Sequence, residues 1–273
     1  MINQFSRTEL IYGKEAMDIL KNSHVCVFGI GGVGGYVCEA LARSGVGHFT
    51  LVDNDVVSLT NLNRQIIATM DTIGKYKVDV MKDRILSINP ECSVNTFKCF
   101  YLPSNADQFD FTHYDYIVDA IDTITAKISI ILKAQEANVK IISSMGAGNK
   151  TNPMAFKITD IYKTETDPLA KVMRRELKKR NVKKLKVAYS TEKALKPLED
   201  ISKDELNVDS KKRSIPGSNA FVPSACGLLI ASEIVKDLTN SVARSELKRW
   251  FILIMQQIIQ QKKKYWMLYV RLN

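Results

Sequence analysis

The sequence contains few of the residues from which metal sites and disulfide frameworks are built. It has three histidines and five cysteines, and no two cysteines form a CxxC pair. Structural zinc sites usually need closely spaced cysteine and histidine pairs, so we expect no such site. An odd number of widely spaced cysteines is typical of a protein from a reducing compartment.

Long apolar runs are also missing. The first ten residues have no apolar core like that of a signal peptide. The longest apolar stretches, at 221–235 and 250–259, are shorter than the roughly 20 residues that span a bilayer. We therefore expect a cytoplasmic protein.

The residues that are present are those of an ordinary globular chain. Of 273 residues, 45% are hydrophobic and 25% are charged, which excludes a disordered chain, a collagen and a coiled-coil rod. The net charge is +10, and it is unevenly distributed. Residues 171–186 hold nine Lys or Arg and one Glu, and residues 244–273 hold seven and one, so the remainder is slightly acidic. This basic C-terminal half favours an anionic partner.

Apolar runs and helical patterns alternate along the first 150 residues. These patterns predict a buried strand at 24–28 and further strands at 48–52, 93–97, 114–120 and 139–143. This alternation predicts an α/β fold, with a Rossmann-like, doubly wound and mostly parallel sheet. Later residues predict a C-terminal α+β extension, with strands at 155–161 and 185–189, a basic helix from 167 to about 180, and a buried helix at 224–238.

We expect three parts along the chain. Residues 1–150 form a nucleotide-binding half, and residues 151–240 form the C-terminal part of the same domain, with a mobile loop at 195–217. Residues 241–273 form a basic and aromatic tail with a helical stretch at 245–264. The tail could pack as a final strand, stack on RNA or lie on an anionic membrane surface.

The first motif with a chemical meaning is a glycine cluster between the first strand and the next helix. Glycines at this place let the backbone approach phosphate oxygens, and the helix N-terminus supplies free N–H groups. The alternative is close packing of the backbone. The cluster consists of Gly29, Gly31, Gly32 and Gly34.

Carboxylates follow the strands at the same edge of the predicted sheet. Asp53 ends the second strand, where a carboxylate accepts hydrogen bonds from a ribose, although a turn or cap role is the alternative. Asp55 belongs either to the loop or to the site. Asp122 follows another strand and either holds Mg²⁺ against phosphates or caps the next helix.

Cations and amides follow Asp53. Two positive side chains beyond the ribose carboxylate suit a triphosphate, because they can neutralise the charge that develops as a phosphoryl bond breaks. A nicotinamide-dependent oxidoreductase, which would share the glycines and Asp53, has no such need. The alternative is a solvated surface position for each side chain. The residues are Asn61, Arg64, Gln65 and Lys77.

Together, these motifs resemble the E1-like adenylating superfamily, which includes ubiquitin-activating enzymes and the bacterial ThiF and MoeB proteins. The resemblance rests on GxGGxG, the Asp53-x-Asp55 pair, NLNRQ at 61–65, Lys77 and DxxD at 119–122. ThiF and MoeB proteins carry two zinc-binding CxxC pairs, which this sequence lacks. Further segments resemble the tRNA threonylcarbamoyladenosine dehydratase branch up to about residue 238, namely FSRTELIYG, INPEC, DAIDT, SSMGAGN, ITDIYKTETDPLAKVMRRELKKR and YSTEKAL.

The resemblance implies roles for these residues. The four glycines would cradle the phosphates of ATP, Asp53 would hold the ribose, and Asp122 would position Mg²⁺. Asn61, Arg64, Gln65 and Lys77 would line the phosphates. Arg7 matches an arginine that in E1-like dimers reaches the ATP of the partner subunit, which implies a homodimer; the alternative is a surface arginine.

The resemblance also implies a reaction. ATP would activate the threonine carboxylate of a modified adenosine at position 37 of tRNA, and the substrate's own ureido nitrogen would close the ring. The basic segment 171–186 could bind tRNA or be a solvated face. A monovalent cation and a cysteine desulfurase or sulfur-acceptor partner are further possibilities from the branch. The main alternative is an adenylating enzyme for a ubiquitin-like or sulfur-carrier protein.

Overall fold

A computed structural model describes residues 2–198 and 216–240. Its strands are β1 (His24–Phe28), β2 (His48–Val52), β3 (Ser93–Phe97), β4 (Tyr116–Asp119), β5 (Lys140–Ser144), β6 (Phe156–Asp160) and β7 (Lys186–Ser190). Its helices are α1 (Ser6–Tyr12), α2 (Lys14–Asn22), α3 (Gly34–Arg43), α4 (Lys77–Ile88), α5 (Ile124–Glu136) and α6 (Pro168–Lys179), and residues 222–240 form one more. The tail and most of the loop expected at 195–217 lie outside the described residues.

The seven strands form one sheet in the order β3-β2-β1-β4-β5-β7-β6. All neighbouring pairs are parallel except β6 with β7, so the prediction of a mostly parallel, doubly wound sheet is confirmed. The strand order reverses between β1 and β4. In open α/β sheets, ligands bind beyond the carboxyl ends of the strands at such a reversal.

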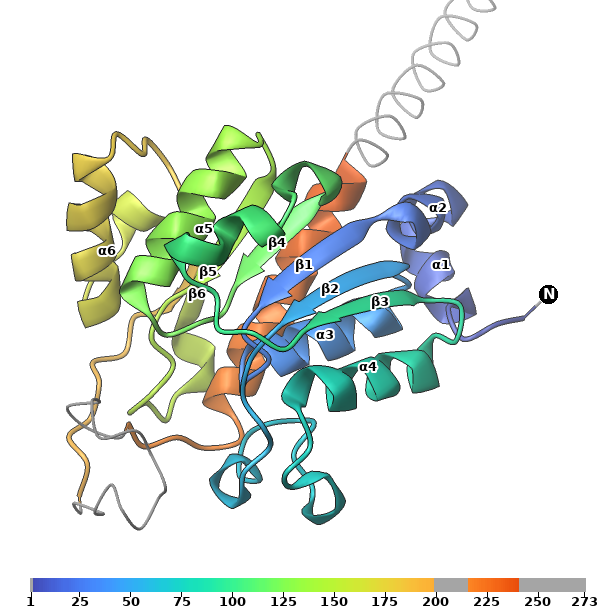
Figure 1. Ribbon diagram of the computed structural model, residues 1–273, viewed down its shortest axis with the longest axis horizontal. Helices are drawn as coiled ribbons and strands as arrows, with labels where there is room; N and C mark the ends of the chain where they lie inside the picture. Colours follow the sequence, from blue (N-terminus) through green and yellow to red (C-terminus); the bar gives the residue numbers. More distant parts are fainter. Residues whose placement is uncertain (1, 199–215, 241–273) are drawn as a thin grey trace, which may run out of the picture.

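Side chains alternate between the two faces of β1, and each set has its own helices. Val25 and Val27 pack with α2, α3, α4 and the helix at 222–240, whereas Cys26 and Phe28 pack with α5 and an aromatic group from residues 101–111. Helix α6 packs beyond α5, against Ile128 and Ile131 (Figure 1). The helices therefore cover both faces of the sheet.

The helix at 222–240 is joined to the amino ends of the central strands by a polar network. Lys186 forms ion pairs with Glu233, at 2.8 Å, and with Asp237. The hydroxyl of Tyr116 donates to Asp237 at 2.7 Å, and burial raises the pKa of that tyrosine. Since Val222 and Cys226 also lie in the main core, residues far beyond position 150 complete the packing of the first half.

In the two described ranges, no helix is long and apolar enough to cross a membrane.

The sequence located all seven strands, the basic helix α6 and the buried helix at 222–240 to within about two residues. It gave no indication of α1, which has no buried residue, because an exposed helix of seven residues has no apolar stripe to detect.

Candidate active site

The glycine loop after β1 is held close to the sheet by backbone contacts. Gly29 has a φ of 91°, and its N–H donates to Val52 at 2.8 Å. A Cβ on Gly34 would lie 1.8 Å from the carbonyl oxygen of Gly29, so no larger residue fits there. A Cβ on Gly31 would meet no atom within 4 Å. The loop is therefore packed on its inner side, and at Gly31 it is open to a ligand above the N-terminus of α3.

Asp53 connects the end of β2 to this loop. Its carboxylate accepts from the N–H of Ile30 at 2.6 Å and from the N–H of Asp55 at 2.8 Å. Burial raises the pKa of Asp53, and the charge of Lys77 and the two backbone hydrogen bonds oppose that shift. The sequence predicted a ribose contact, with a turn or cap role as the alternative; the two backbone hydrogen bonds show that Asp53 fixes the shape of the glycine loop.

Lys77 lies at the first position of α4 and is almost completely buried. Its Nζ is 2.7 Å from Oδ2 of Asp55, whose side chain is exposed. Both residues lie beside Asp53 at the sheet edge. The structure thus places Lys77 in the predicted region, with a carboxylate as its partner.

The segment 61–65 lies against the open side of the glycine loop. Arg64 donates to the carbonyl oxygen of Thr60 at 2.8 Å, and its Cγ would be 3.5 Å from a Cβ on Gly32. Burial lowers the pKa of the Arg64 guanidinium, and the nearby charge of Asp122 opposes this shift. Arg64 therefore lies between the glycine loop and the loop after β4, as a phosphate-binding residue would.

The two amides of this segment that were predicted as site residues, Asn61 and Gln65, differ in their surroundings. Oδ1 of Asn61 accepts from the N–H of Ser58 at 3.1 Å and so stabilises a turn. Gln65 is 7% exposed, and its Oε1 has no hydrogen-bond partner among the residues that the structure describes. A buried oxygen without a partner costs free energy, so it calls for a donor from a ligand or from water.

The two aspartates after β4 have different surroundings. Asp119 is fully buried, forms an ion pair at 3.0 Å with the equally buried Lys127 and accepts from the hydroxyl of Ser143. The Nζ of Lys127 also donates at 2.9 Å to the carbonyl oxygens of Ile121 and Ser144. Asp119 is therefore not available to a metal.

Asp122 lies next to this fixed carbonyl of Ile121, and its side chain is exposed. No group of three or more His, Cys, Asp and Glu residues in the described part of the chain could hold a metal ion. Mg²⁺ commonly takes only one or two carboxylates and completes its shell with phosphate oxygens and water, so the role predicted for Asp122 does not require such a group.

Lys127 was not predicted as a buried, paired residue, although the sequence contains one signal for it. Lys127 interrupts an apolar helix, since Ala126, Ile128, Ile130 and Ile131 around it are all buried. A charged residue in such a stretch must find a partner in the core. Its partner, Asp119, had been noted only as part of a motif.

A second buried pair was missed in the same way. Lys150 and Asp167 are 2% and 0% exposed in their side chains and lie 3.3 Å apart. Lys150 also donates to the carbonyl oxygen of Gly146, and Asp167 caps α6 through the N–H of Ala170 at 2.8 Å. This pair attaches the beginning of α6 to the loop after β5, at the same edge of the sheet.

One of the predicted residues, Arg7, lies apart from this edge. Arg7 is exposed on α1, and the neighbouring Phe5 packs beside Gly45, at the amino ends of the strands (Figure 1). Within one chain, Arg7 and the glycine loop therefore lie at opposite edges of the sheet. Cys226 is fully buried beside Ser144, and burial raises the pKa of its thiol to about 12, which makes it unreactive.

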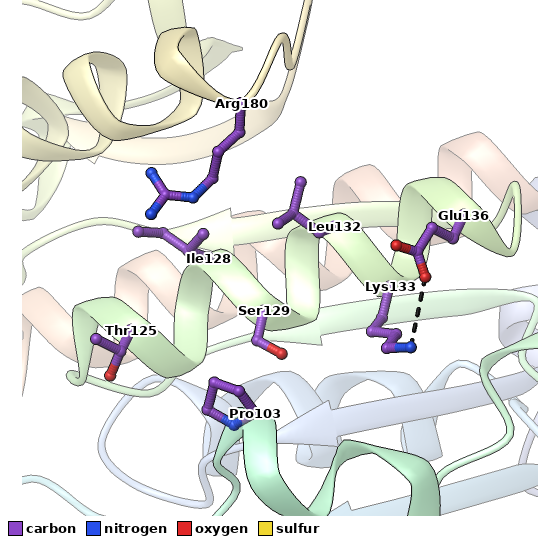
Figure 2. A pocket seen from close by; sticks show the side chains of 8 residues that line it. All are labelled: Pro103, Thr125, Ile128, Ser129, Leu132, Lys133, Glu136 and Arg180. Atoms are coloured by element: carbon purple, nitrogen blue, oxygen red, sulfur yellow. Dashed lines mark ion pairs between the residues drawn. The ribbon is translucent and has the colours of Figure 1, made fainter.

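A groove of about 330 Å³ lies on the outside of the molecule, away from all of these residues. Its walls come from α5, from Pro103 and from the end of α6, where Arg180 extends over Ile128 (Figure 2). Lys133 at its rim is paired with Glu136 at 3.5 Å. The groove does not overlap with the candidate site.

The ThiF family model matches residues 5–264. The tRNA threonylcarbamoyladenosine dehydratase of Bacillus subtilis is 48% identical over 253 residues, which cover 91% of this chain and 98% of that protein. The Escherichia coli protein of the same name is 36% identical over 255 residues, with 88% and 95% coverage.

Solved structures agree with these relationships. The crystal structure of the E. coli dehydratase TcdA in complex with ATP has a TM-score of 0.78 at 34% identity and covers 88% of this chain and 96% of that one. E. coli MccB, with a TM-score of 0.61 at 22% identity, shares the fold.

Proposed function

The chain belongs to the ThiF family, and from this membership we propose that it is an ATP-dependent dehydratase of threonylcarbamoyladenosine at position 37 of tRNA. Two observations together carry the proposal. The chain is 48% identical to a named dehydratase over 91% of its own length, and its glycine loop is open at Gly31. Its cytoplasmic location is part of the same proposal, because the substrate is a tRNA.

The sheet edge suits ATP as a co-substrate. The N–H groups at the start of α3 and the open backbone at Gly31 would bind phosphates, and Asp53 would accept from the ribose. The partnerless oxygen of Gln65 would accept a hydrogen bond from the nucleotide or its water. Arg64 and Lys77 would neutralise charge that develops on the phosphates. Mg²⁺, when bound at Asp122, would add a further positive charge against the phosphate oxygens.

The chemistry is activation of a carboxylate. One oxygen of the threonine carboxylate attacks the α-phosphate of ATP, and pyrophosphate leaves. The ureido nitrogen of the same side chain then attacks the activated carbonyl and loses its proton, and AMP leaves with the carboxylate oxygen. Ring closure needs little beyond correct positioning, because nucleophile and electrophile belong to one molecule. The buried, protonated Cys226 fits a reaction that uses no protein thiol.

A homodimer would complete the site. Leu10 and Ile11 on α1 are 87% and 79% exposed, an unusual exposure for neighbouring apolar residues that a partner subunit would cover. Arg7 on the same helix would then reach the ATP of the partner. Subunits carrying Arg7→Ala, mixed with subunits carrying Arg64→Ala, should form heterodimers with one intact site and regain activity. Absence of any recovery, with heterodimers present, would contradict this role of Arg7.

The monovalent cation and the cysteine desulfurase or sulfur-acceptor partner remain predictions from the family resemblance. Stimulation of activity by K⁺ over Na⁺, and co-purification with a desulfurase, are the measurements that test them.

The proposed function is tested with ATP, Mg²⁺ and tRNA that carries threonylcarbamoyladenosine. The nucleoside should lose the mass of one water, and AMP should form in equal amount. An unchanged nucleoside with folded, ATP-binding protein would refute the proposal. Pyrophosphate exchange that is stimulated by a carrier protein with a Gly-Gly end, and not by the tRNA, would instead favour the carrier-activating alternative.

A further inference from the structure

Helix α6 presents a row of cations on the face that is turned away from the protein. Its buried stripe is Ala170, Met173 and Leu177. The opposite face has exposed cations at i, i+4, i+7 and i+8, which lie side by side on a helix. These are Lys171, Arg175, Lys178 and Lys179, and the exposed Lys183 and Lys184 follow just after the helix.

These cations fall into two groups. Glu176 is the one acidic residue of α6, and it pairs with Arg175 at 3.2 Å, Lys179 at 3.1 Å and Arg180 at 3.0 Å. By contrast, four lysines form no ion pair with any residue in the described ranges 2–198 and 216–240. They are Lys171, Lys178, Lys183 and Lys184. Their charge is therefore available to a partner.

The position of the helix connects this face to the candidate site. The buried pair of Lys150 and Asp167 fixes the N-terminus of α6 to the loop after β5, at the carboxyl edge of the sheet. From there the twelve residues of α6 extend for about 18 Å. The lysine face thus begins at the edge where the nucleotide would bind and leads away from it.

The type of partner follows from the side chains. Lysines are strongly hydrated and are depleted in the cores of protein–protein interfaces, and this face has no large exposed apolar residue for a protein to bury. Phosphate groups need only charge and hydrogen-bond donors, which the lysines provide without losing their hydration completely. The face therefore fits a nucleic-acid backbone better than an acidic protein.

We propose that the lysine face of α6, made by Lys171, Lys178, Lys183 and Lys184, binds the phosphate backbone of the substrate tRNA outside the modified nucleotide. This inference rests on the proposed function and adds the surface on which the RNA lies. The contacts are electrostatic and independent of sequence, so they increase affinity for tRNA without taking part in the chemistry.

The affinity for tRNA should depend on salt in a way that counts the phosphate contacts. Each lysine that neutralises a phosphate contributes about 0.7 to 0.9 to the slope of log affinity against log salt. This corresponds to at least about fivefold in affinity per contact between 1 M and 0.1 M salt. Loss of two contacts should therefore raise the Kd for tRNA about 25-fold at 0.1 M salt and lower the slope by about 1.4 to 1.8.

The test compares two double variants with the same change in net charge. K171Q/K178Q removes two lysines from α6. K14Q/K82Q removes two helical lysines that form no ion pair with any described residue, one from α2 and one from α4, on the far flank of the sheet (Figure 1). The Kd of tRNA carrying threonylcarbamoyladenosine is measured between 0.05 and 0.5 M salt by fluorescence anisotropy, beside the Kd of ATP and the kcat of dehydration at saturating tRNA.

We expect K171Q/K178Q to raise the Kd for tRNA about 25-fold at 0.1 M salt. Its Kd for ATP and its kcat should stay at the wild-type values. K14Q/K82Q should change the Kd for tRNA about twofold or less. Equal tRNA affinity in the wild type and K171Q/K178Q would overturn the proposal and leave this face to an acidic protein. Equal weakening in both variants would also overturn it, because net charge alone would then explain the effect. Both outcomes apply only if the wild-type protein dehydrates the tRNA. Failure of the wild type to do so would refute the proposed function instead.

Discussion

Lysines occur in two contrasting surroundings in this molecule. Lys127 and Lys150, at the carboxyl edge of the sheet, are almost completely buried, and each has a carboxylate and a backbone carbonyl as partners. Lys171 and Lys178, on α6, are exposed and have no acidic partner among the described residues. A buried cation must be paired, so it fixes the position of its partners. An exposed lysine remains hydrated and acts on its surroundings only through its charge, which salt weakens.

This contrast explains how one chain can bind both a small and a large anion. The buried pairs fix the loops after β4 and β5, at the edge where we propose that the nucleotide binds. The exposed face needs no fixed geometry, because phosphates along an RNA can meet mobile side chains in many arrangements. The predictions below separate the two kinds of lysine.

The largest effect is expected from loss of a buried lysine. Lys127→Met would leave Asp119 buried without its cation and should lower the free energy of unfolding by about 3 to 5 kcal/mol. Urea unfolding measures this change. Lys171→Met on α6 is the matched control and should stay within about 0.5 kcal/mol of the wild type. The double variant K127M/D119N should recover part of the lost free energy of unfolding. Equal stability of K127M and the wild type would show that the Lys127–Asp119 pair does not hold the loop in place.

A slightly smaller effect, on the rate of catalysis, is expected from loss of Arg64, the cation beside the glycine loop. Arg64→Ala should lower kcat by about 10² to 10³ without unfolding the protein, because one group that stabilises developing charge is lost. Arg43→Ala removes an exposed arginine that is paired with Glu39, and it should keep the wild-type kcat. If Arg64→Ala keeps full kcat under saturating ATP, Arg64 does not belong to the phosphate site.

The sequence predicted more of the fold than of the site. Apolar runs of five residues identify strands reliably, because a buried parallel strand must be apolar on both faces. The motif residues were also located well, since Asp53, Asp55, Lys77 and Arg64 all lie at one edge of the sheet. The partners of these side chains could not be predicted, because the pairing of Lys127 with Asp119 or of Lys150 with Asp167 depends on how separate loops pack.

A third prediction concerns pH and a buried thiol. Burial raises the pKa of Cys226 to about 12, so the folded protein keeps this proton at pH values at which the unfolded chain loses it. The stability that this provides is present below about pH 9 and is lost as pH rises towards 12, by up to about 1.4 kcal/mol per pH unit. Cys226→Ala should therefore show a shallower loss of unfolding free energy between pH 9 and 11 than the wild type. Equal slopes would mean that this thiol is not held protonated.

The smallest effect is expected from a change on the exposed lysine face. Unlike the other variants, this one should strengthen a property, the affinity for tRNA. Glu176→Gln releases Arg175, Lys179 and Arg180 from their shared carboxylate and removes one negative charge, so the net charge rises by one. The affinity for tRNA at 0.1 M salt should rise by about two- to fivefold, since one more cation can meet a phosphate. Anisotropy titrations measure it. Weaker tRNA binding by Glu176→Gln would indicate that the ion pairs themselves shape the surface.

The most direct test of the account follows one oxygen atom. If ATP activates the carboxylate by adenylyl transfer at the sheet edge, tRNA whose threonylcarbamoyl carboxylate is labelled with ¹⁸O should give AMP that carries one ¹⁸O, together with a nucleoside that is lighter by one water. Mass spectrometry of both products measures this in a single reaction. Unlabelled AMP, or a label found in inorganic phosphate beside ADP, would contradict the proposed chemistry.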